Sequence, residues 1–368
     1  MTSEANKTIS TEKFGNHLDW MDYLRFVAAL SVIFFHYCSN GILSGKISSI
    51  DNFGLLSVIS EYGYLGVDLF FIISGFVILY SVENKTADGF ANARFVRLYP
   101  AYIACMTITA LATAIWGNGV SLMQYLANLS MVASYLGYQN MDGTYWTLAL
   151  ELTFYAMVLI IFLIGQEGRL EKIVSAWIVL MMIFRIFSFN LPLFSGYFPL
   201  FAAGSLFAFI YKQGYSWMRV TLLAIVFLLS LDGAIDRASS IDARKFRESN
   251  DYITSGITAT FFLIFILFRN FRARLPASKT VGALTYPIYL LHANIGYLIL
   301  SNFGSNEHRW MALIGTISVI LIGGWMIHHF VERLPKKYWN QLADRSIGTI
   351  IRLIAGVRKK FYKYQLGK

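Results

Sequence analysis

The segment LDWMDYLRFVAALSVIFFHY, residues 18–37, decides the class of this chain. It is apolar and has the length of a membrane-spanning helix, which needs about 20 residues. Arg25 and His36 are eleven residues apart in it. This separation is three helical turns plus about 20°, so both side chains lie on one face, about 16 Å apart along the axis. Ionisable groups inside a span are costly and mark functional sites, so the segment predicts a membrane enzyme or a transporter rather than a scaffold.

The composition extends this prediction to the whole chain. Hydrophobic residues make up 56% of the 368 residues and charged residues only 14%, whereas a soluble domain carries about 25% charged residues. The net charge of +10 fits the excess of Lys and Arg in the inner loops of membrane proteins, so we expect no nucleic-acid partner. Cys38 and Cys105 lack the spacing of a metal site or a disulfide framework. The polar residues 1–17 do not form a cleavable signal peptide.

Ten apolar stretches predict an all-α integral membrane protein, a bundle of about ten transmembrane helices. The expected spans are 20–38, 63–81, 96–116, 144–164, 172–189, 195–212, 217–234, 252–269, 281–301 and 310–330. A weaker stretch at 121–137 contains Gln124, Asn128 and Ser130, and we expect a re-entrant or interfacial segment there. The predicted organisation is a tail (1–17), a transmembrane domain (18–336) and a basic tail (337–368).

The distribution of basic residues predicts the orientation. With the N-terminus inside, 23 of the 31 Lys and Arg residues fall on the inner side and only six in outer loops. This bias predicts that both termini are cytoplasmic and that the loop 236–251 is outside. In the tail, apolar residues recur at helical spacing from Gln341 to Tyr364, with basic residues between them. We expect an amphipathic helix on the inner membrane surface; the alternative is a solvated charged tail.

Arg94 and Arg97, in RFVRLYP at 94–100, lie one turn apart at the inner end of a span. Two guanidinium groups on one face suit a phosphate or pyrophosphate group, although an arginine pair there also arises from the positive-inside bias. With Arg25 near the inner end of its own span, the three could form a basic pocket open to the cytoplasm.

His36 is expected in the outer half of the membrane, where a neutral imidazole can accept a proton from a hydroxyl. Asp68, in GYLGVDLFFIISGF, lies at the same depth and could orient His36; the alternative is an acid that reaches the outer interface. Ser74 and Gly75 lie deeper in the same span; a Ser-Gly pair permits close helix packing, which we expect, or a ligand that lies against the backbone.

Glu151 follows the start of another span, with Tyr155 one turn further on the same face. A buried carboxylate needs a partner, and we expect His36, Arg185 or the substrate. His292 lies in mid-span after Pro287, where an unwound carbonyl could bond a side chain or a ligand. The chain contains no metal-ligand spacing, no Walker loop, no dinucleotide glycine motif and no serine nucleophile elbow.

Six segments, taken together in this order, resemble the bacterial membrane acyltransferase-3 family over residues 18–336. They are DYLR at 22–25 followed by His36, GVDLFFIISGF at 66–76, RFVRLYP at 94–100, YWTLALE at 145–151, YPIYLLH at 286–292 and VERLP at 331–335. The family's tryptophan-serine dipeptide is Trp146-Thr147 here, a mild departure. The extracytoplasmic hydrolase-like domain of some members is not expected.

The resemblance implies ten core spans, cytoplasmic termini, acetyl-CoA as the usual donor and a histidine-dependent transfer to an extracytoplasmic glycan. By motif position, His36 would be the essential histidine, Arg25 its partner, and Arg94 and Arg97 the arginine pair.

These observations together predict an O-acyltransferase of the bacterial inner membrane, first of all an O-acetyltransferase that uses acetyl-CoA and no metal. The expected catalytic residues are His36, Asp68 and Glu151; Arg25, Arg94 and Arg97 would bind the donor, and Trp146, Tyr155 and His292 the acceptor. The acceptor would be a glycan or glycolipid: an O-antigen, an exopolysaccharide or a lipo-oligosaccharide. The alternatives are O-succinyl or longer acyl transfer, and a proton-coupled exporter, since intramembrane Asp, Glu and His also form proton relays.

Overall fold

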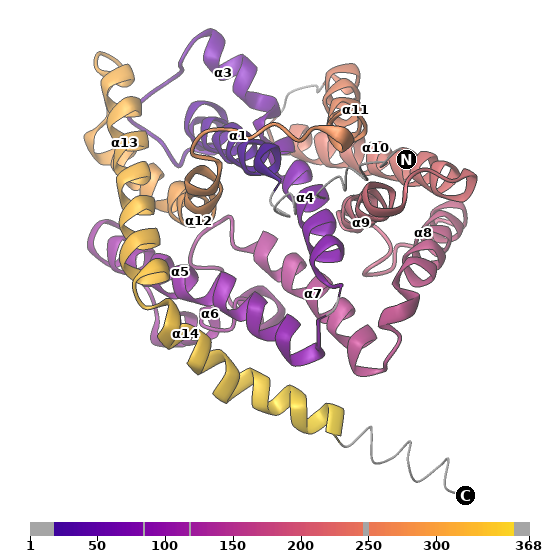
Figure 1. Ribbon diagram of the computed structural model, residues 1–368. Coiled ribbons are helices and arrows are strands. Elements are labelled where there is room, and N and C mark those ends of the chain that lie inside the picture. Colours follow the sequence, from indigo (N-terminus) through magenta and orange to yellow (C-terminus); the bar gives the residue numbers. More distant parts are fainter. Residues whose placement is uncertain (1–17, 84, 118, 246–249, 357–368) are drawn as a thin grey trace, which may run out of the picture.

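A computed structural model describes residues 18–83, 85–117, 119–245 and 250–356, with the side chains of 242–245 left aside (Figure 1). The predicted N-terminal tail, 1–17, lies outside the described residues. The α-helices are α1 (Asp19–Phe35), α2 (Gly41–Leu43), α3 (Leu55–Ser60), α4 (Gly66–Ser81), α5 (Ala87–Trp116), α6 (Leu122–Asn128), α7 (Trp146–Leu163), α8 (Leu170–Ile186), α9 (Phe198–Gln213), α10 (Trp217–Lys245), α11 (Asp251–Leu267), α12 (Ser278–Phe303), α13 (Arg309–Ile327) and α14 (Lys336–Ala343). Short 3₁₀ or π-helical turns continue or join several of them, among them His36–Asn40, Glu61–Leu65, Ala133–Leu136, His328–Arg333 and Asp344–Gly348.

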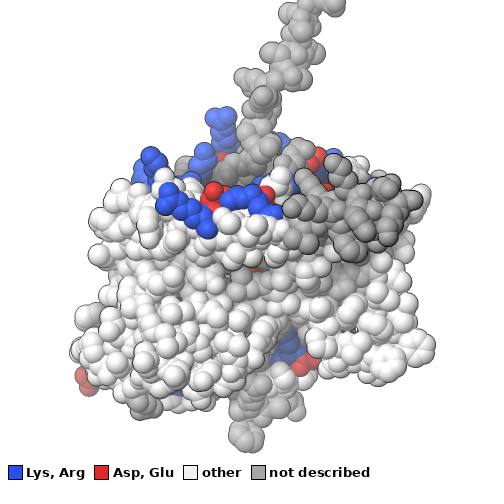
Figure 2. All heavy atoms as spheres, turned by 90° about the horizontal axis from the view of Figure 1, so that it is seen from below, with Lys and Arg blue, Asp and Glu red and all other residues white. Residues whose placement is uncertain are grey.

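The all-α membrane fold is confirmed, and every predicted span coincides with a helix. Within the described residues, eight helices have the length and apolar composition to cross a membrane: α1, α4 with α3, α5, α7, α10, α11, α12 and α13. The helices at the other two predicted spans, α8 and α9, have 17 and 16 residues, fewer than the roughly 20 of a typical span. Figure 2 shows one face as a broad uncharged belt, with Lys and Arg gathered mainly along one edge.

The centre of the bundle is α4, which packs along α9. The two backbones approach so closely that a Cβ on Gly75 would lie 2.2 Å from the Phe201 carbonyl oxygen, and one on Gly204 1.9 Å from that of Ile72. Only glycine fits such a contact, which is how small residues bring membrane helices together. The packing expected of the Ser-Gly pair therefore holds for Gly75, whereas Ser74 faces a cavity described below.

The segment 121–137 forms a short helix and a turn that pack on the rest of the protein, and it does not form a membrane span. It forms the seven-residue α6 and a 3₁₀ turn at Ala133–Leu136. The buried Asn128 fixes it: its Nδ2 donates to the Gln124 and Gln139 carbonyl oxygens at 2.8 and 2.9 Å, and its Oδ1 accepts from the Met141 N–H at 2.8 Å. Non-helical backbone at membrane depth is tolerated where protein satisfies it in this way.

The prediction of an outer loop at 236–251 is wrong in the extent of the loop, because α10 continues to Lys245. Asp236 and Arg237 are therefore helical residues. The extension carries Arg237, whose guanidinium reaches into the bundle and pairs with Asp68.

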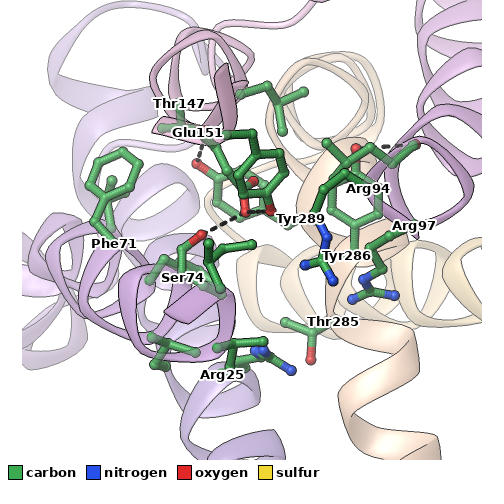
Figure 3. A pocket seen from close by; sticks show the side chains of 18 of the residues that line it. Arg25, Phe71, Ser74, Arg94, Arg97, Thr147, Glu151, Thr285, Tyr286 and Tyr289 are labelled. Carbon is green, nitrogen blue, oxygen red and sulfur yellow. Dashed lines mark hydrogen bonds between the residues drawn. The ribbon is translucent and has the colours of Figure 1, made fainter. Parts of the chain in front are cut away.

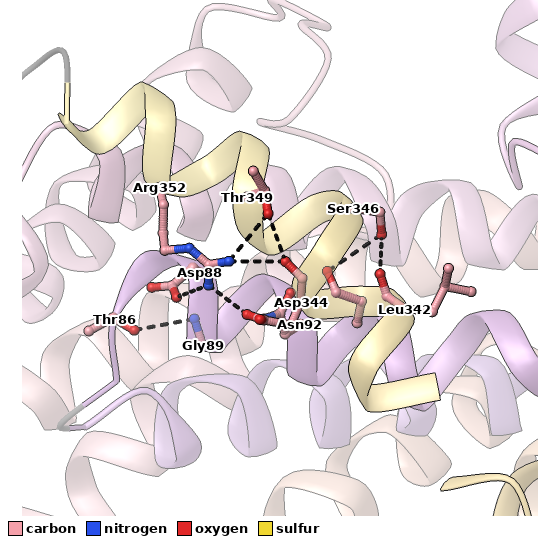
Figure 4. Close-up of polar contacts among 10 residues, drawn as sticks. Thr86, Asp88, Gly89, Asn92, Leu342, Asp344, Ser346, Thr349 and Arg352 are labelled. Atoms are coloured by element: carbon pink, nitrogen blue, oxygen red, sulfur yellow. Dashed lines mark hydrogen bonds and ion pairs between the residues drawn. The ribbon is translucent and has the colours of Figure 1, made fainter. Parts of the chain in front are cut away.

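The C-terminal helix lies along the first turns of α5 (Figure 4). The Arg352 guanidinium donates to Asp88 Oδ2 at 3.2 Å and to Asp344 Oδ1 at 2.5 Å, and Asn92 Nδ2 donates to Asp344 Oδ1 at 3.4 Å. We call these four residues the C-terminal latch. It ties the tail to the helix that also carries Arg94 and Arg97.

The predicted helix of the tail is present over the described part, where helical residues run from 336 to 356. Ile350, Leu353 and Ile354 expose 57%, 66% and 48% of their surface, as expected of a helix with an unpartnered apolar face. The rest of the predicted helix, 357–364, lies outside the described residues.

Candidate active site

A cavity of about 410 Å³ lies between α1, α4, α5, α7 and α12 (Figure 3). The polar side chains on its wall are Arg25, Ser74, Arg94, Arg97, Thr147, Glu151, Tyr155, Thr285, Tyr286 and Tyr289, and the rest of the wall is apolar. We call it the central cavity. Its size lies in the range of small-molecule sites.

The three arginines expected to meet do line this one cavity. Arg25 reaches it from α1 and retains Asp22 as a partner, with 3.3 Å from Nη1 to Oδ1. Arg94 and Arg97 reach it from α5, where residues three apart share a face. Arg94 lies over the Tyr155 ring (5.7 Å) and Arg97 over the Tyr286 ring (5.4 Å).

Neither Arg94 nor Arg97 forms an ion pair with a carboxylate in the part of the chain that the structure describes, and the buried Arg94 Nε has no hydrogen-bond partner there. Cavity-lining cations that form no ion pair with a carboxylate are suited to bind an anionic ligand.

Glu151 stands on the α7 wall and is held by two hydroxyls. Its Oε1 accepts from Ser74 Oγ at 2.8 Å and from the Tyr155 hydroxyl. Glu151 and Tyr155 therefore lie one turn apart on the same face of α7, as predicted. The expected contact with Arg185 is wrong, because Arg185 pairs with Asp232 at 2.7 Å on the surface.

Asp68 has another partner than expected. The buried carboxylate accepts a hydrogen bond from the guanidinium of Arg237, which also lies over the Tyr197 ring at 4.3 Å and donates to the Gly196 carbonyl oxygen at 3.1 Å. Trp146 packs at 5.0 Å on the same Tyr197 ring and does not line the central cavity. The partnership expected between Asp68 and His36 is replaced by an ion pair between α4 and α10.

His36 lies where α1 changes into a π-helical turn, His36–Asn40. Such turns often occur at functional sites. The Nδ1 atom of His36 contacts the Tyr297 hydroxyl and lies 3.4 Å from Asn40 Nδ2. Its ring is 5.1 Å from the ring of His292. His36 itself does not line the central cavity.

His292 connects the two regions. Its Nδ1 lies 2.7 Å from the Tyr289 carbonyl oxygen. A carbonyl only accepts, so Nδ1 carries the proton and neutral His292 has its lone pair on Nε2. That atom is buried and has no hydrogen-bond partner among the described residues. The Tyr289 ring, 5.3 Å from His292, belongs to the cavity wall and its hydroxyl lies 3.1 Å from Thr147 Oγ1.

The unwinding expected after Pro287 is not seen, because α12 runs through Pro287 as one continuous helix, but side chains do bond two carbonyls of the turns that follow it. The Tyr145 hydroxyl donates to the Leu290 carbonyl oxygen at 3.2 Å, and the Tyr37 hydroxyl donates to that of His292 at 2.7 Å. These bonds fix the part of α12 that carries His292.

Asp142, which was not predicted, holds the same part of α12. It is fully buried, its Oδ2 accepts from the Asn294 N–H at 2.8 Å, and its Oδ1 accepts from the Thr144 N–H and hydroxyl at 2.8 and 2.7 Å. The signal in the sequence was an acid three residues before the YWTLALE segment. Among the described residues, no group of three His, Cys, Asp or Glu could hold a metal ion.

Comparisons with known proteins identify the family of this chain. A family model described as an acyltransferase domain matches residues 18–329. The chain is 28% identical over 168 residues to "Nodulation protein 10" of Rhizobium leguminosarum bv. viciae, which covers 40% of this chain and 44% of that protein. It is 43% identical over 53 residues to "Protein 2 in picA locus" of Rhizobium radiobacter, 13% of this chain and 28% of that protein. The chain therefore spans less than half the length of either relative, and no solved structure matches it significantly.

Proposed function

Because the chain belongs to the acyltransferase-3 family, we propose that it transfers an acetyl group from acetyl-CoA to a hydroxyl of an extracytoplasmic glycan. The observation that supports this most is the central cavity, where Arg94 and Arg97 stand without carboxylate partners among the described residues. The family supports O-acyl transfer in a membrane. The acetyl donor, the glycan acceptor and the roles of individual residues are our proposal.

The donor would approach from the cytoplasm and place its phosphates against Arg94 and Arg97. Charge-assisted bonds from guanidinium groups to phosphate are among the strong hydrogen bonds in proteins. The pantetheine arm would then extend along the cavity past Glu151 and Ser74 towards Tyr289. The roughly 16 Å of helix between Arg25 and His36 is within reach of an extended arm.

The acceptor would arrive from the outer side, where His36 meets Tyr297 and Asn40. His36 takes the proton of the acceptor hydroxyl as its oxygen bonds to the acyl carbon; the carbon–sulfur bond breaks, and the thiolate leaves inwards and later takes up a proton. Tyr289 and His292 separate the cavity from His36, so their side chains must make room for the reacting groups.

The protonated His36 is a donor at both ring nitrogens. The ring of His292, whose buried Nε2 has no hydrogen-bond partner among the described residues, lies 5.1 Å from the His36 ring. We assign His292, rather than Asp68, as the residue that stabilises His36 after proton transfer. An enzyme of this kind would lie in the inner membrane with both termini in the cytoplasm.

The test is cleavage of the thioester by the pure protein in detergent. Acetyl-CoA is incubated with protein and a glycolipid extract of a deletion strain, and released CoA is measured with a thiol reagent. Release that depends on protein and extract supports the proposal. Replacement of acetyl-CoA by succinyl-CoA tests the acyl group, and absence of release from either donor would contradict an acyl-CoA-dependent transfer.

Arg94→Ala and Arg97→Ala should weaken CoA binding about 10- to 100-fold, the effect of losing 1.5–3 kcal/mol per charge-assisted contact. Calorimetric titration of CoA measures this. Lys336→Ala, an exposed lysine of α14, is the control for non-specific loss of charge. If all four proteins bind CoA with equal affinity, the arginine pair does not bind the donor and reflects only the positive-inside bias.

A further inference from the structure

A second cavity of about 690 Å³, which we call the vestibule, adjoins the central cavity. Arg25 and Val77 line both of them, so the two spaces meet at these side chains. The vestibule lies where α1 begins and where α4 and α9 end. In the proposed orientation these are the cytoplasmic ends of the helices, so a donor from the cytoplasm would pass through the vestibule.

The walls of the vestibule carry both aromatic rings and cations. Tyr80 and Tyr211 meet edge to face with their ring centres 5.5 Å apart, and Lys212 lies over the Tyr80 ring at 5.2 Å. An aromatic surface binds a nucleobase by stacking, and a neighbouring cation binds phosphate. This pairing of groups is suited to a phosphorylated nucleoside.

Lys85 adds a cation that is close to the central cavity. Burial and the positive charge of Arg94 lower the pKa of Lys85. A group in this situation gains from an anion that offsets both charges. No carboxylate forms an ion pair with Lys85 within the residues that the structure describes.

The other vestibule lysine, Lys212, is paired with Glu83 at 2.7 Å. Glu83 is two-thirds exposed, and such an exposed ion pair is weak because solvent screens it. A phosphate that carries more charge than a carboxylate can therefore compete for Lys212. Asp22, the other acid on this wall, lies beside Arg25.

Size also favours two compartments for one elongated ligand. The central cavity, at about 410 Å³, is near the lower limit for drug-sized ligands, and acyl-CoA is larger than such ligands. We propose that the vestibule binds the 3′-phosphoadenosine end of the donor, while the diphosphate, the pantetheine arm and the acyl group extend past Arg25 into the central cavity, where the diphosphate lies against Arg94 and Arg97. This inference rests on the proposed function, because it assumes a coenzyme A donor.

The test combines variants with shortened ligands. Wild type, Lys85→Ala and Lys212→Ala are purified as full chains in detergent and titrated by calorimetry with CoA, with dephospho-CoA and with 4′-phosphopantetheine, which lacks the nucleoside. Each lysine variant should bind CoA about tenfold more weakly, the effect of one charge-assisted contact. Both should bind 4′-phosphopantetheine as wild type does.

Lys279→Ala is the matched control, because Lys279 lines a different basic cavity near the start of α12. If Lys279→Ala weakens CoA binding while Lys85→Ala and Lys212→Ala do not, the nucleoside end lies in that other cavity and the inference is wrong. Equal losses for CoA and 4′-phosphopantetheine would also contradict it, because the lysines would then act on the whole site. A wild type that binds no CoA at all would instead overturn the proposed function.

Discussion

His36 receives its surroundings from α12, with Tyr297 on one side and His292 on the other. Helical spacing alone predicted that Arg25 and His36 lie on one face of the first span. The partner of His36 could not be predicted from the sequence, because residues 36 and 292 are brought together only by the packing of α1 on α12. The same limit applies to Asp68, whose partner Arg237 lies 169 positions away.

His292→Asn tests the histidine pair. The asparagine amide can still donate to the Tyr289 carbonyl oxygen, but it offers no acceptor at the position of Nε2. We expect kcat to fall about 10- to 100-fold, since a hydrogen bond to a charged group is worth roughly 1.5–3 kcal/mol. Affinity for CoA should not change. An unchanged kcat in a folded variant would show that His36 does not depend on His292.

Asp68→Asn should act on stability rather than on chemistry. The ion pair of Asp68 with Arg237 is nearly buried, with 1% and 12% of the side chains exposed, and breaking such a pair typically costs about 3–5 kcal/mol. Thermal unfolding in detergent should therefore begin at a clearly lower temperature, with turnover per folded molecule retained. Arg185→Ala, which breaks the exposed pair with Asp232, is the control and should cost about 1 kcal/mol or less. A folded Asp68→Asn protein that loses turnover would return Asp68 to the role of orienting His36.

At the scale of elements, apolar stretches predicted where helices occur but not how far they extend. Residues 236–245 are too polar for a predicted span, yet α10 continues through them, and Arg237 in this part pairs with Asp68 of α4. The 121–137 stretch is apolar, but its buried Asn128 fixes a short helix and a loop instead of a span. The polar residues of 121–137 already indicated this outcome in the sequence, whereas the ion pair of Arg237 with Asp68 joins two distant elements, and periodicity does not report such contacts.

The C-terminal latch joins the tail to α5. Arg352→Ala removes the bonds to Asp88 and Asp344, so we expect faster backbone hydrogen exchange over residues 336–356 at pH 7. Arg345→Ala, on the same helix and exposed, is the matched control and should exchange as wild type does. Equal exchange in the two variants would mean that apolar packing alone holds the tail.

The latch also predicts a dependence on pH. Its hydrogen bond and ion pair with Arg352 lower the pKa of Asp344 below the ordinary value of 3.8. The latch is therefore fully present above 3.8 and is lost as the pH falls through the lowered pKa. Hydrogen exchange of the wild-type tail, corrected for the intrinsic rate, should not change between pH 5 and 8. Loosening within that range would point to another titrating group.

At the scale of the whole molecule, the eight candidate spans among the described residues and the uncharged belt of Figure 2 make this a multi-pass membrane protein. The inward orientation of the termini is predicted from the distribution of Lys and Arg alone. Ser240→Cys tests it, because Ser240 is exposed near the end of α10. A membrane-impermeant thiol reagent should label this cysteine in intact spheroplasts, and labelling only after permeabilisation would reverse the topology.

The account depends most on His36 as the base in acyl transfer to a glycan. The direct measurement is the mass spectrum of surface glycans from a deletion strain complemented with wild type, with His36→Ala or with the control Lys336→Ala, at equal membrane levels of each protein. Loss of a general base typically costs about 10²- to 10⁴-fold, so acetylated glycan should return with wild type and Lys336→Ala and stay absent with His36→Ala. Acetylation restored by His36→Ala to the wild-type level would contradict the central claim.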